Sequence, residues 1–311
     1  MTKLACIVPT CNAEIVLARL LDSLDQQTCS VDIFVVDSSS SDSTIAVAHG
    51  RSCSHKIIAR ADFNHGGTRQ MMINEIYEYD IFIFLTQDAY LEGASSIEYL
   101  VSPFADERVG AVCGRQLPHF DASLLAQHAR FFNYPASSRT VSLSDAPKYG
   151  MKTPFISNSF AAYRGSALRE VGGFPRHVIL AEDMYVAARM LLGGWKVVYE
   201  GRACCRHSHN YSLVEEFRRY FDIGVFHSRE RWIRDEFGSA GGEGVRYVVS
   251  ELQFLGWRRM HLWPSSLLRN ILKLFAYKLA QYEAWIPVGL KRQLSMHKHY
   301  WEGTYSKCRV K

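Results

Sequence analysis

Short apolar runs and helical repeats alternate along the first 90 residues of the chain. Between the first two runs, leucines recur at positions 17, 20, 21 and 24, which predicts an amphipathic helix that Asn12 is expected to cap. A second helix is predicted over residues 68–78. Strands that alternate with helices in this way are typical of a parallel α/β sheet. The runs that predict its buried strands are residues 4–8, 31–36, 56–59 and 81–85.

The rest of the chain has a less regular middle and a helical end. Strands are predicted at residues 108–116, 155–164 and 196–200, and a helix at 181–195. From residue 213 onward, the apolar positions follow helical spacing. Residues 267–285 form a long amphipathic stretch, with an apolar stripe of Leu268, Ile271, Leu272, Phe275 and Leu279 on one side. The sequence therefore predicts two parts, an α/β domain over residues 1–212 and a helical region over residues 213–311.

Polar residues follow the ends of the predicted strands. Pro9 and Thr10 follow the first strand, Asp37 follows the second, and Asp88 lies just beyond the fourth. Ligands of parallel α/β sheets gather outside the carboxyl ends of the strands, so this edge is the predicted active site. Asp37 could accept the imide N–H of a pyrimidine base, although ordinary turn chemistry is an open alternative.

Three further motifs carry groups suited to chemistry, each with a plain structural alternative. The segment "HGGTR" has glycines that let backbone approach a phosphate and Arg69 to pair with it, or it is only a helix-start turn. Glu182 and Asp183 begin a predicted helix, as a general base or as favourable charge at its N-terminus. His207 and His209 lie on one side of an extended segment, as metal ligands or as surface polar residues.

Charge is distributed unevenly along the chain. Residues 1–201 carry 17 Lys and Arg against 21 Asp and Glu, a balance of −4, whereas residues 252–311 carry 11 against 2, a balance of +9. This basic tail also holds four of the six tryptophans, at positions 257, 263, 285 and 301. Basic charge mixed with aromatic rings indicates an anionic surface, either nucleic acid or a membrane face. No signal-peptide pattern and no apolar run of about 20 residues is present, so a cytoplasmic location is expected.

The order of these motifs resembles the family 2 glycosyltransferases of the GT-A fold. The resemblance runs over roughly residues 3–210, through "CIVPTCN", "VVDSSSSDST", "FLTQDA", "VGGF" and "AEDMYVAARMLLGGWKVVY". Within the family, "FNHGGTRQ", "TQDA" and "HSHNYS" are similar to bacterial rhamnosyltransferases that use dTDP-L-rhamnose. The resemblance implies a Rossmann-like, mixed but mainly parallel sheet flanked by helices, with a helical C-terminal extension.

The resemblance also implies a metal site in "FLTQDA". The family usually has Asp-x-Asp at this strand end, whereas here Thr86 takes the first position and Asp88 the second. Asp88 is implied as the direct ligand, with His207 as a further one. Oxygen and imidazole ligands together suit Mg²⁺ or Mn²⁺, so a divalent cation is the expected cofactor.

The remaining site residues follow from the same resemblance, which implies an inverting transfer. Asp183 is implied as the general base, with Glu182 as the second candidate. The residues implied for nucleotide-sugar binding are Pro9, Thr10, Asp37, Asn64, Gly66, Arg69, Thr86, Gln87 and Asp88. Those implied for the donor or acceptor pocket are Asn158, Gly173, Phe174 and His209.

The expected partners are dTDP-L-rhamnose as donor and a glycan acceptor carried on a polyprenyl diphosphate. The basic, Trp-rich tail is expected to bind the anionic inner face of the cell membrane, and packing on the catalytic domain or in a homodimer is the alternative. Two rival functions stay open: a family member that uses another dTDP- or UDP-hexose, and a non-catalytic protein that binds nucleotide or nucleic acid. No nucleic-acid-binding motif is visible in the sequence.

Overall fold

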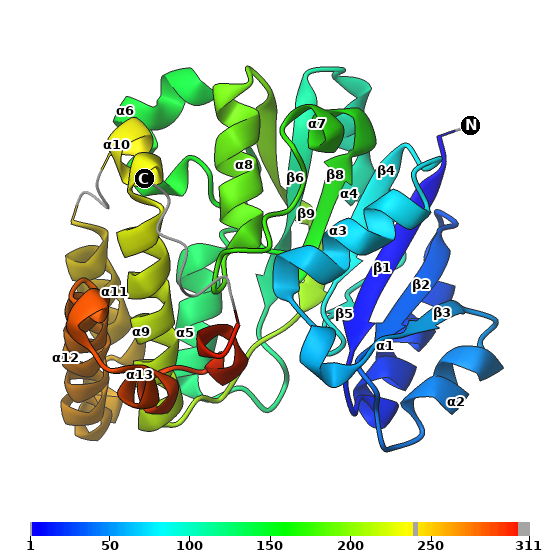
Figure 1. Cartoon of the computed structure of the whole chain (residues 1–311). Coiled ribbons are helices and arrows are strands. Elements are labelled where there is room, and N and C mark those ends of the chain that lie inside the picture. The colour runs from blue at the N-terminus through cyan, green and yellow to red at the C-terminus, as the bar shows by residue number, and fades with distance from the viewer. Residues whose placement is uncertain (1, 239–241, 304–311) are drawn as a thin grey trace.

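The computed structural model describes residues 2–238 and 242–303, and their strands form one mixed sheet (Figure 1). The strand order is β3-β2-β1-β4-β8-β6-β9-β5, with β7 paired to β9. The mixed sheet and its helical C-terminal part confirm the predicted fold class. The strands are β1 (Leu4–Thr10), β2 (Asp32–Asp37), β3 (Ser54–Ile57), β4 (Ile81–Leu85), β5 (Tyr90–Leu91), β6 (Val109–Leu117), β7 (Arg139–Val141), β8 (Phe160–Arg164) and β9 (Lys196–Arg206).

The first four strands run parallel, so their carboxyl ends meet at one edge of the sheet. In the register of β1 and β2, Thr10 lies opposite Asp37. Strand β8 then runs antiparallel to β4 and β6, while β6 and β9 are parallel to each other. The two segments that carry Asp88 and His207 therefore leave the sheet on strands that β8 and β6 separate.

Helices cover both faces of the sheet, as the alternation along β1 requires. Ala5 and Ile7 face a core formed with α3 and α8, whereas Cys6 and Val8 face a core formed with α1 and α4. The helices of this part are α1 (Glu14–Asp25), α2 (Thr44–Gly50), α3 (His65–Glu75), α4 (Ser96–Val101), α5 (Leu124–Asn133), α6 (Ala146–Tyr149), α7 (Gly165–Glu170) and α8 (Glu182–Leu192).

The C-terminal helices pack at the side of the molecule away from β2 and β3 (Figure 1). They are α9 (Leu213–Arg229), α10 (Arg231–Phe237), α11 (Glu243–Leu255), α12 (Trp263–Ala280) and α13 (Val288–Leu294). Helix α9 starts at a capping box of Ser212 and Glu215 and packs closely along α12. The close approach of α9 to α12 depends on Gly224, because a Cβ there would lie 2.6 Å from the Ala280 Cβ and 2.7 Å from the Tyr277 carbonyl oxygen.

Several element boundaries differ from those predicted. Asn12 does not cap α1; its φ is 49° and its side-chain oxygen accepts the Ser41 N–H at 2.9 Å, so it ties two loops together. The helix predicted over 68–78 begins earlier, at His65. The strand predicted over 155–164 begins at Phe160.

Helix α12 ends at Ala280, and a separate 3₁₀ turn, Glu283–Trp285, follows it. The stretch that the sequence analysis treated as one amphipathic segment up to residue 285 is therefore two elements. Among residues 2–238 and 242–303, no helix combines the length and the apolar character that crossing a bilayer would need.

Candidate active site

One cavity of about 990 Å³ opens at the carboxyl ends of β1 and β4 and extends to the C-terminal helices. Pro9, Thr86, Gln87 and Asp88 line its wall at the sheet edge. The Thr86 hydroxyl oxygen is buried and has no hydrogen-bond partner among the described residues. A polar atom in this state at a cavity wall is available to a ligand.

Thr10 and Asp37 lie at the same edge but are buried and do not line the cavity. The Asp37 carboxylate accepts hydrogen bonds from the Thr10 hydroxyl at 3.0 Å and from the Ser40 N–H at 2.7 Å. Gln87, just after β4, joins the ends of β1 and β4, because its side-chain oxygen accepts the Cys11 N–H at 2.8 Å. These contacts fix the shape of the edge at which Pro9 and Asp88 are exposed to a ligand.

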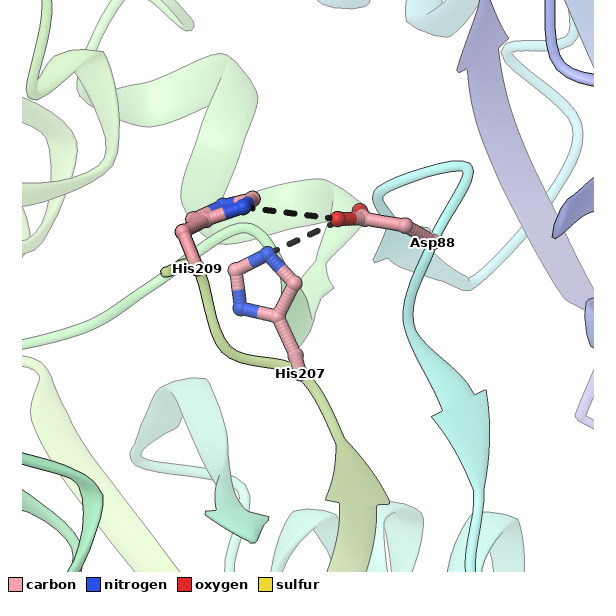
Figure 2. A group of neighbouring side chains, drawn as sticks. All are labelled: Asp88, His207 and His209. Carbon is pink, nitrogen blue, oxygen red and sulfur yellow. Dashed lines mark ion pairs between the residues drawn. The ribbon is translucent and has the colours of Figure 1, made fainter. Parts of the chain in front are cut away.

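Asp88, His207 and His209 converge on one point of the cavity wall (Figure 2). One ligand atom from each lies within 4.8 Å of the other two. The Asp88 carboxylate is 3.6 Å from His207 Nε2 and 3.8 Å from His209 Nδ1. We call these three residues the metal triad. His209, predicted as a pocket residue, therefore stands beside the two predicted metal ligands.

Gln116, at the end of β6, sets the tautomer of His207. Its buried side-chain oxygen accepts from His207 Nδ1–H at 3.0 Å and also from the Arg130 guanidinium. An amide oxygen only accepts, so Nδ1 carries the proton and Nε2 offers its lone pair toward Asp88. The Gln116 amide N–H donates to the Ser157 hydroxyl oxygen at 2.9 Å, which keeps the Gln116 side-chain oxygen pointing at His207.

Both imidazoles of the metal triad are neutral at pH 7. Burial, followed by the neighbouring His209 and Arg130, holds the pKa of His207 well below its usual value. Burial also lowers the pKa of His209, although Asp88 opposes that shift. One carboxylate and two neutral imidazoles fit a divalent cation, and the two nitrogen ligands favour Mn²⁺ over Mg²⁺, which prefers an all-oxygen shell.

The two predicted catalytic acids at the start of α8 occupy different environments. Glu182 is buried and forms an ion pair with Arg69 at 2.9 Å, and its carboxylate accepts from the Asn158 amide at 3.0 Å. Burial alone would raise the pKa of Glu182, but Arg69 and His65 lower it overall. Glu182 is therefore a fixed negative charge inside the protein.

Asp183 is half-buried and has no cationic partner of its own among the described residues. Its carboxylate accepts the N–H groups of Asn158 at 3.0 Å and of Met184 at 2.8 Å. Burial, together with the negative charge of Glu182, raises the pKa of Asp183 to about 6. Asp183 does not itself line the cavity, but Ser157 and Ser159, on either side of its partner Asn158, do.

Asn64 and Gly66 serve local structure at the start of α3, and neither lines the cavity. The Asn64 side chain caps the helix by accepting the Gly67 N–H at 2.7 Å. A Cβ at Gly66 would lie 1.9 Å from the Pro175 carbonyl oxygen, so only glycine permits this close approach. Their predicted nucleotide contacts stay predictions, whereas Arg69, from the same segment, does line the cavity.

Gly173 and Phe174 are likewise held away from the cavity wall. Gly173 has a φ of 69°, and a Cβ there would lie 1.9 Å from the Gln70 side-chain oxygen. Phe174 is buried in edge-to-face contacts with Phe84 and Tyr163. Their predicted place in the substrate pocket stays untested, and the contacts give both residues a packing role.

The sequence analysis missed several residues that line the same cavity. Gln116 gave a recognisable signal, because it is a polar residue near the end of an apolar strand, like Asp37 and Asp88. The others come from α5, α9, α12 and the segment after α13, all distant in sequence, and gave no local signal. They are Arg130, Arg219, Arg269, Lys273 and His297.

The mixed sheet flanked by helices, with a carboxylate and two histidines at one edge, has the architecture of the GT-A fold. The family model described as glycosyl transferase family 2 matches residues 5–172. The chain belongs to this family and is a glycosyltransferase.

Two relatives are similar over nearly the whole chain. The O-antigen chain rhamnosyltransferase RfbN of Salmonella typhimurium strain LT2 is 48% identical over 302 residues, which is 96% of each chain. The O-antigen chain rhamnosyltransferase WbaN of Salmonella anatum is 46% identical over 306 residues, which is 97% of this chain and 96% of that one.

Solved structures share the fold at low identity. A Pyrobaculum calidifontis mannosyltransferase in complex with GDP-mannose and Mn²⁺ has a TM-score of 0.59 at 19% identity, covering 96% of this chain and 85% of that one. The S. aureus protein TarS, residues 1–349, in complex with UDP-GlcNAc has a TM-score of 0.53 at 14% identity, covering 91% of this chain and 92% of that one. Both support the GT-A architecture.

The Gln116 contact gives a test of the metal triad. Gln116→Leu should weaken Mn²⁺ binding by about 10- to 100-fold, because His207 loses the acceptor that orients its ring and fixes its tautomer. Titration of Mn²⁺ followed by electron paramagnetic resonance measures this directly. Gln253→Leu, at an exposed position on α11, is the matched control and should bind as the unaltered protein does. Unchanged affinity in a folded Gln116→Leu protein would contradict the role given to Gln116.

Proposed function

We propose that this chain transfers L-rhamnose from dTDP-β-L-rhamnose to a hydroxyl of a lipid-linked glycan during O-antigen synthesis. The observation that carries the proposal is the 46–48% identity to two O-antigen chain rhamnosyltransferases across at least 96% of the chain. Family membership favours this enzymatic function over a non-catalytic nucleotide- or nucleic-acid-binding role.

The sheet edge would hold the donor. Pro9 and Gln87 would lie along the nucleoside, and Asp88, His207 and His209 would hold a divalent cation beside the diphosphate. Such a cation neutralises the charge that develops on a departing nucleoside diphosphate. Arg69 lines the cavity, but Glu182 already pairs with it, so its main contribution would be to keep that acid in place.

Asp183 would act as the general base. It would take the proton from the acceptor hydroxyl as that oxygen attacks the anomeric carbon, while the bond from that carbon to the diphosphate breaks on the opposite side. One such displacement inverts the anomeric centre and gives an α-L-rhamnoside. The Glu182 charge supports this role, because it raises the proton affinity of Asp183 toward the value a base needs near neutral pH.

Donor identity is tested by turnover with dTDP-L-rhamnose, dTDP-glucose and UDP-glucose, measured as release of the nucleoside diphosphate. The expected result is the highest kcat/KM with dTDP-L-rhamnose. Comparable or higher kcat/KM with another donor would support the alternative of a different dTDP- or UDP-hexose.

The same assay with Asp183→Asn should show a loss of about 10²- to 10⁴-fold in kcat, the usual contribution of a general base.

The pH profile separates the two acids. A base works only when ionised, so kcat/KM should rise with pH through about 6 and then level off. Glu182→Gln should move this rise to lower pH, because it removes the neighbouring negative charge that raises the pKa of Asp183. A rise that stays near pH 6 in Glu182→Gln would show that another group titrates. The variant also leaves Arg69 without its partner, so its folded state is checked by thermal melting.

The same proposal places the enzyme on the cytoplasmic face of the membrane. Large apolar side chains of α12 are exposed, as are tryptophans of the adjoining turns, with Ile271, Trp257 and Trp285 at 63%, 76% and 87% exposure. Arg258 and Arg259, next to Trp257, are exposed as well. Exposed tryptophan and aliphatic residues with nearby cations suit an anionic bilayer interface. The other exposed apolar residues of these elements are Met260, Leu267, Leu268, Leu274 and Phe275, and we call the whole set the apolar face.

The described structure divides the predicted apolar stripe. Leu268, Ile271 and Phe275 are exposed, whereas Leu272 and Leu279 are partly buried, so packing inside the protein accounts for part of the stripe. Residues 304–311 of the basic tail lie outside the described residues. A homodimer that covers the exposed part is the competing arrangement.

Vesicle flotation tests membrane binding. The protein should float with anionic vesicles at low salt, float little with neutral vesicles, and be released by high salt, since each cation near an anionic leaflet contributes about 1 kcal/mol and is screened by ions. Trp257→Ala combined with Trp285→Ala should reduce flotation. Equal flotation with both vesicle types, or none, counts against this face and in favour of an interface between proteins.

A further inference from the structure

The cavity does not end at the metal triad. Beyond His209 it continues between α5 on one side and α9, α11 and α12 on the other. Tyr211 stands at the junction: its ring centroid is 4.9 Å from that of His209, and its carbonyl oxygen accepts from the Arg269 guanidinium at 3.0 Å. The sheet-edge part would accommodate the donor, so this second part is free for another ligand.

Cations outnumber carboxylates in this second part. The charged side chains that α9 and α12 contribute to its wall are the cations Arg219, Arg269 and Lys273 and the single carboxylate of Glu216. Glu216 lies 3.0 Å from Arg269 and 3.3 Å from Lys273, and these three side chains are only 15%, 21% and 11% exposed. One carboxylate therefore serves two largely buried cations, which leaves an excess of positive charge facing the cavity.

Contacts inside the protein do not satisfy this group of cations. The Nε–H of Arg269 is buried and has no hydrogen-bond partner among the described residues. Arg219 forms no ion pair within residues 2–238 and 242–303; its guanidinium lies only over the Tyr211 ring, at 5.8 Å. Lys273 has the rings of Tyr220 and Tyr247 at 5.7 and 5.5 Å, so aromatic contacts account for part of its burial. An anionic ligand would satisfy the donors that remain.

We infer that Arg219, Arg269 and Lys273 bind a phosphate or diphosphate group carried by the acceptor. Guanidinium and ammonium groups in a partly dry wall are suited to phosphate oxygens. The inference rests on the proposed function, because it takes the sheet-edge part of the cavity as the donor site and the second part as the acceptor site.

The position of the anion site also fits an acceptor with a lipid chain. Leu262 and Ser265, at the start of α12, line the same part of the cavity. Met260, Leu267 and Leu268, close to them in sequence, are exposed on the apolar face described above. A molecule with its anionic group at Arg269 could thus extend its apolar chain toward that face, with its sugar toward Asp183.

Binding of decyl diphosphate tests the site without knowledge of the acceptor sugar. Calorimetry is carried out below the critical micelle concentration, with dTDP and Mn²⁺ saturating, so that the donor site is filled. Decyl glucoside is the neutral comparison. Arg269→Gln and Lys273→Gln should each weaken binding of decyl diphosphate by about 10- to 100-fold, the effect of losing a hydrogen bond to a charged group. Binding of decyl glucoside should not change.

Three further variants make the result specific. Glu216→Gln should strengthen binding of decyl diphosphate, because it removes the competing carboxylate. Lys273→Arg should retain binding, which separates loss of charge from loss of fold. Arg246→Gln, on an exposed arginine of α11 outside the cavity, should have no effect.

Two outcomes would overturn the inference. One is equal affinity for decyl diphosphate in the unaltered protein and in folded Arg269→Gln and Lys273→Gln. The other is a parallel loss of dTDP affinity in these variants, which would assign the cations to the donor diphosphate instead. Failure of the proposed function would be seen separately, as absence of turnover with dTDP-L-rhamnose.

Discussion

The buried ion pair between Arg69 and Glu182 is the contact on which the arrangement of the site depends. It joins α3 to the first turn of α8, two helices that are more than 100 residues apart in sequence. Breaking a buried pair of this kind by removing one partner costs about 3–5 kcal/mol, because the other charge is left without compensation. The pair also fixes a negative charge beside Asp183. One interaction thus stabilises the fold and holds in place the charge that, after burial, does most to raise the pKa of Asp183.

The acid pair at the start of α8 and the metal triad show opposite electrostatic effects. At the start of α8, burial and the negative charge of Glu182 raise the pKa of Asp183, which stabilises its protonated form. At the metal triad, burial and nearby guanidinium groups keep two imidazoles unprotonated, so that their nitrogen lone pairs are free. Gln116 connects the second arrangement to the sheet, because its side chain is held by Arg130 and Ser157 while it orients His207.

Much of the fold could be predicted from sequence because apolar runs identify buried strands well. Asp88 could be found by the same reasoning, since it follows such a run, and the alternation of an extended chain placed His207 and His209 on one side. The partners of these residues could not be found in this way. Asp88 meets the histidines because β5, which begins two residues after it, pairs with the end of β9 so that Tyr90 lies opposite Arg206, and strand pairing is not encoded in local spacing. Asn12 illustrates the opposite error, because a residue type common at helix caps instead bonds to a distant loop.

The close packing of α9 on α12 has a consequence for how the molecule can move. Only Asn210 and Tyr211 separate His209 from Ser212, where α9 is capped, so His209 and the helix are linked by a short covalent span. Gly224 in turn lets α9 lie directly against Ala280, with no room for a larger side chain between the two helices. Tyr211 adds a second link, because its ring contacts His209 and its carbonyl oxygen accepts from Arg269 of α12. We therefore expect a displacement of α12 to move His209 as well.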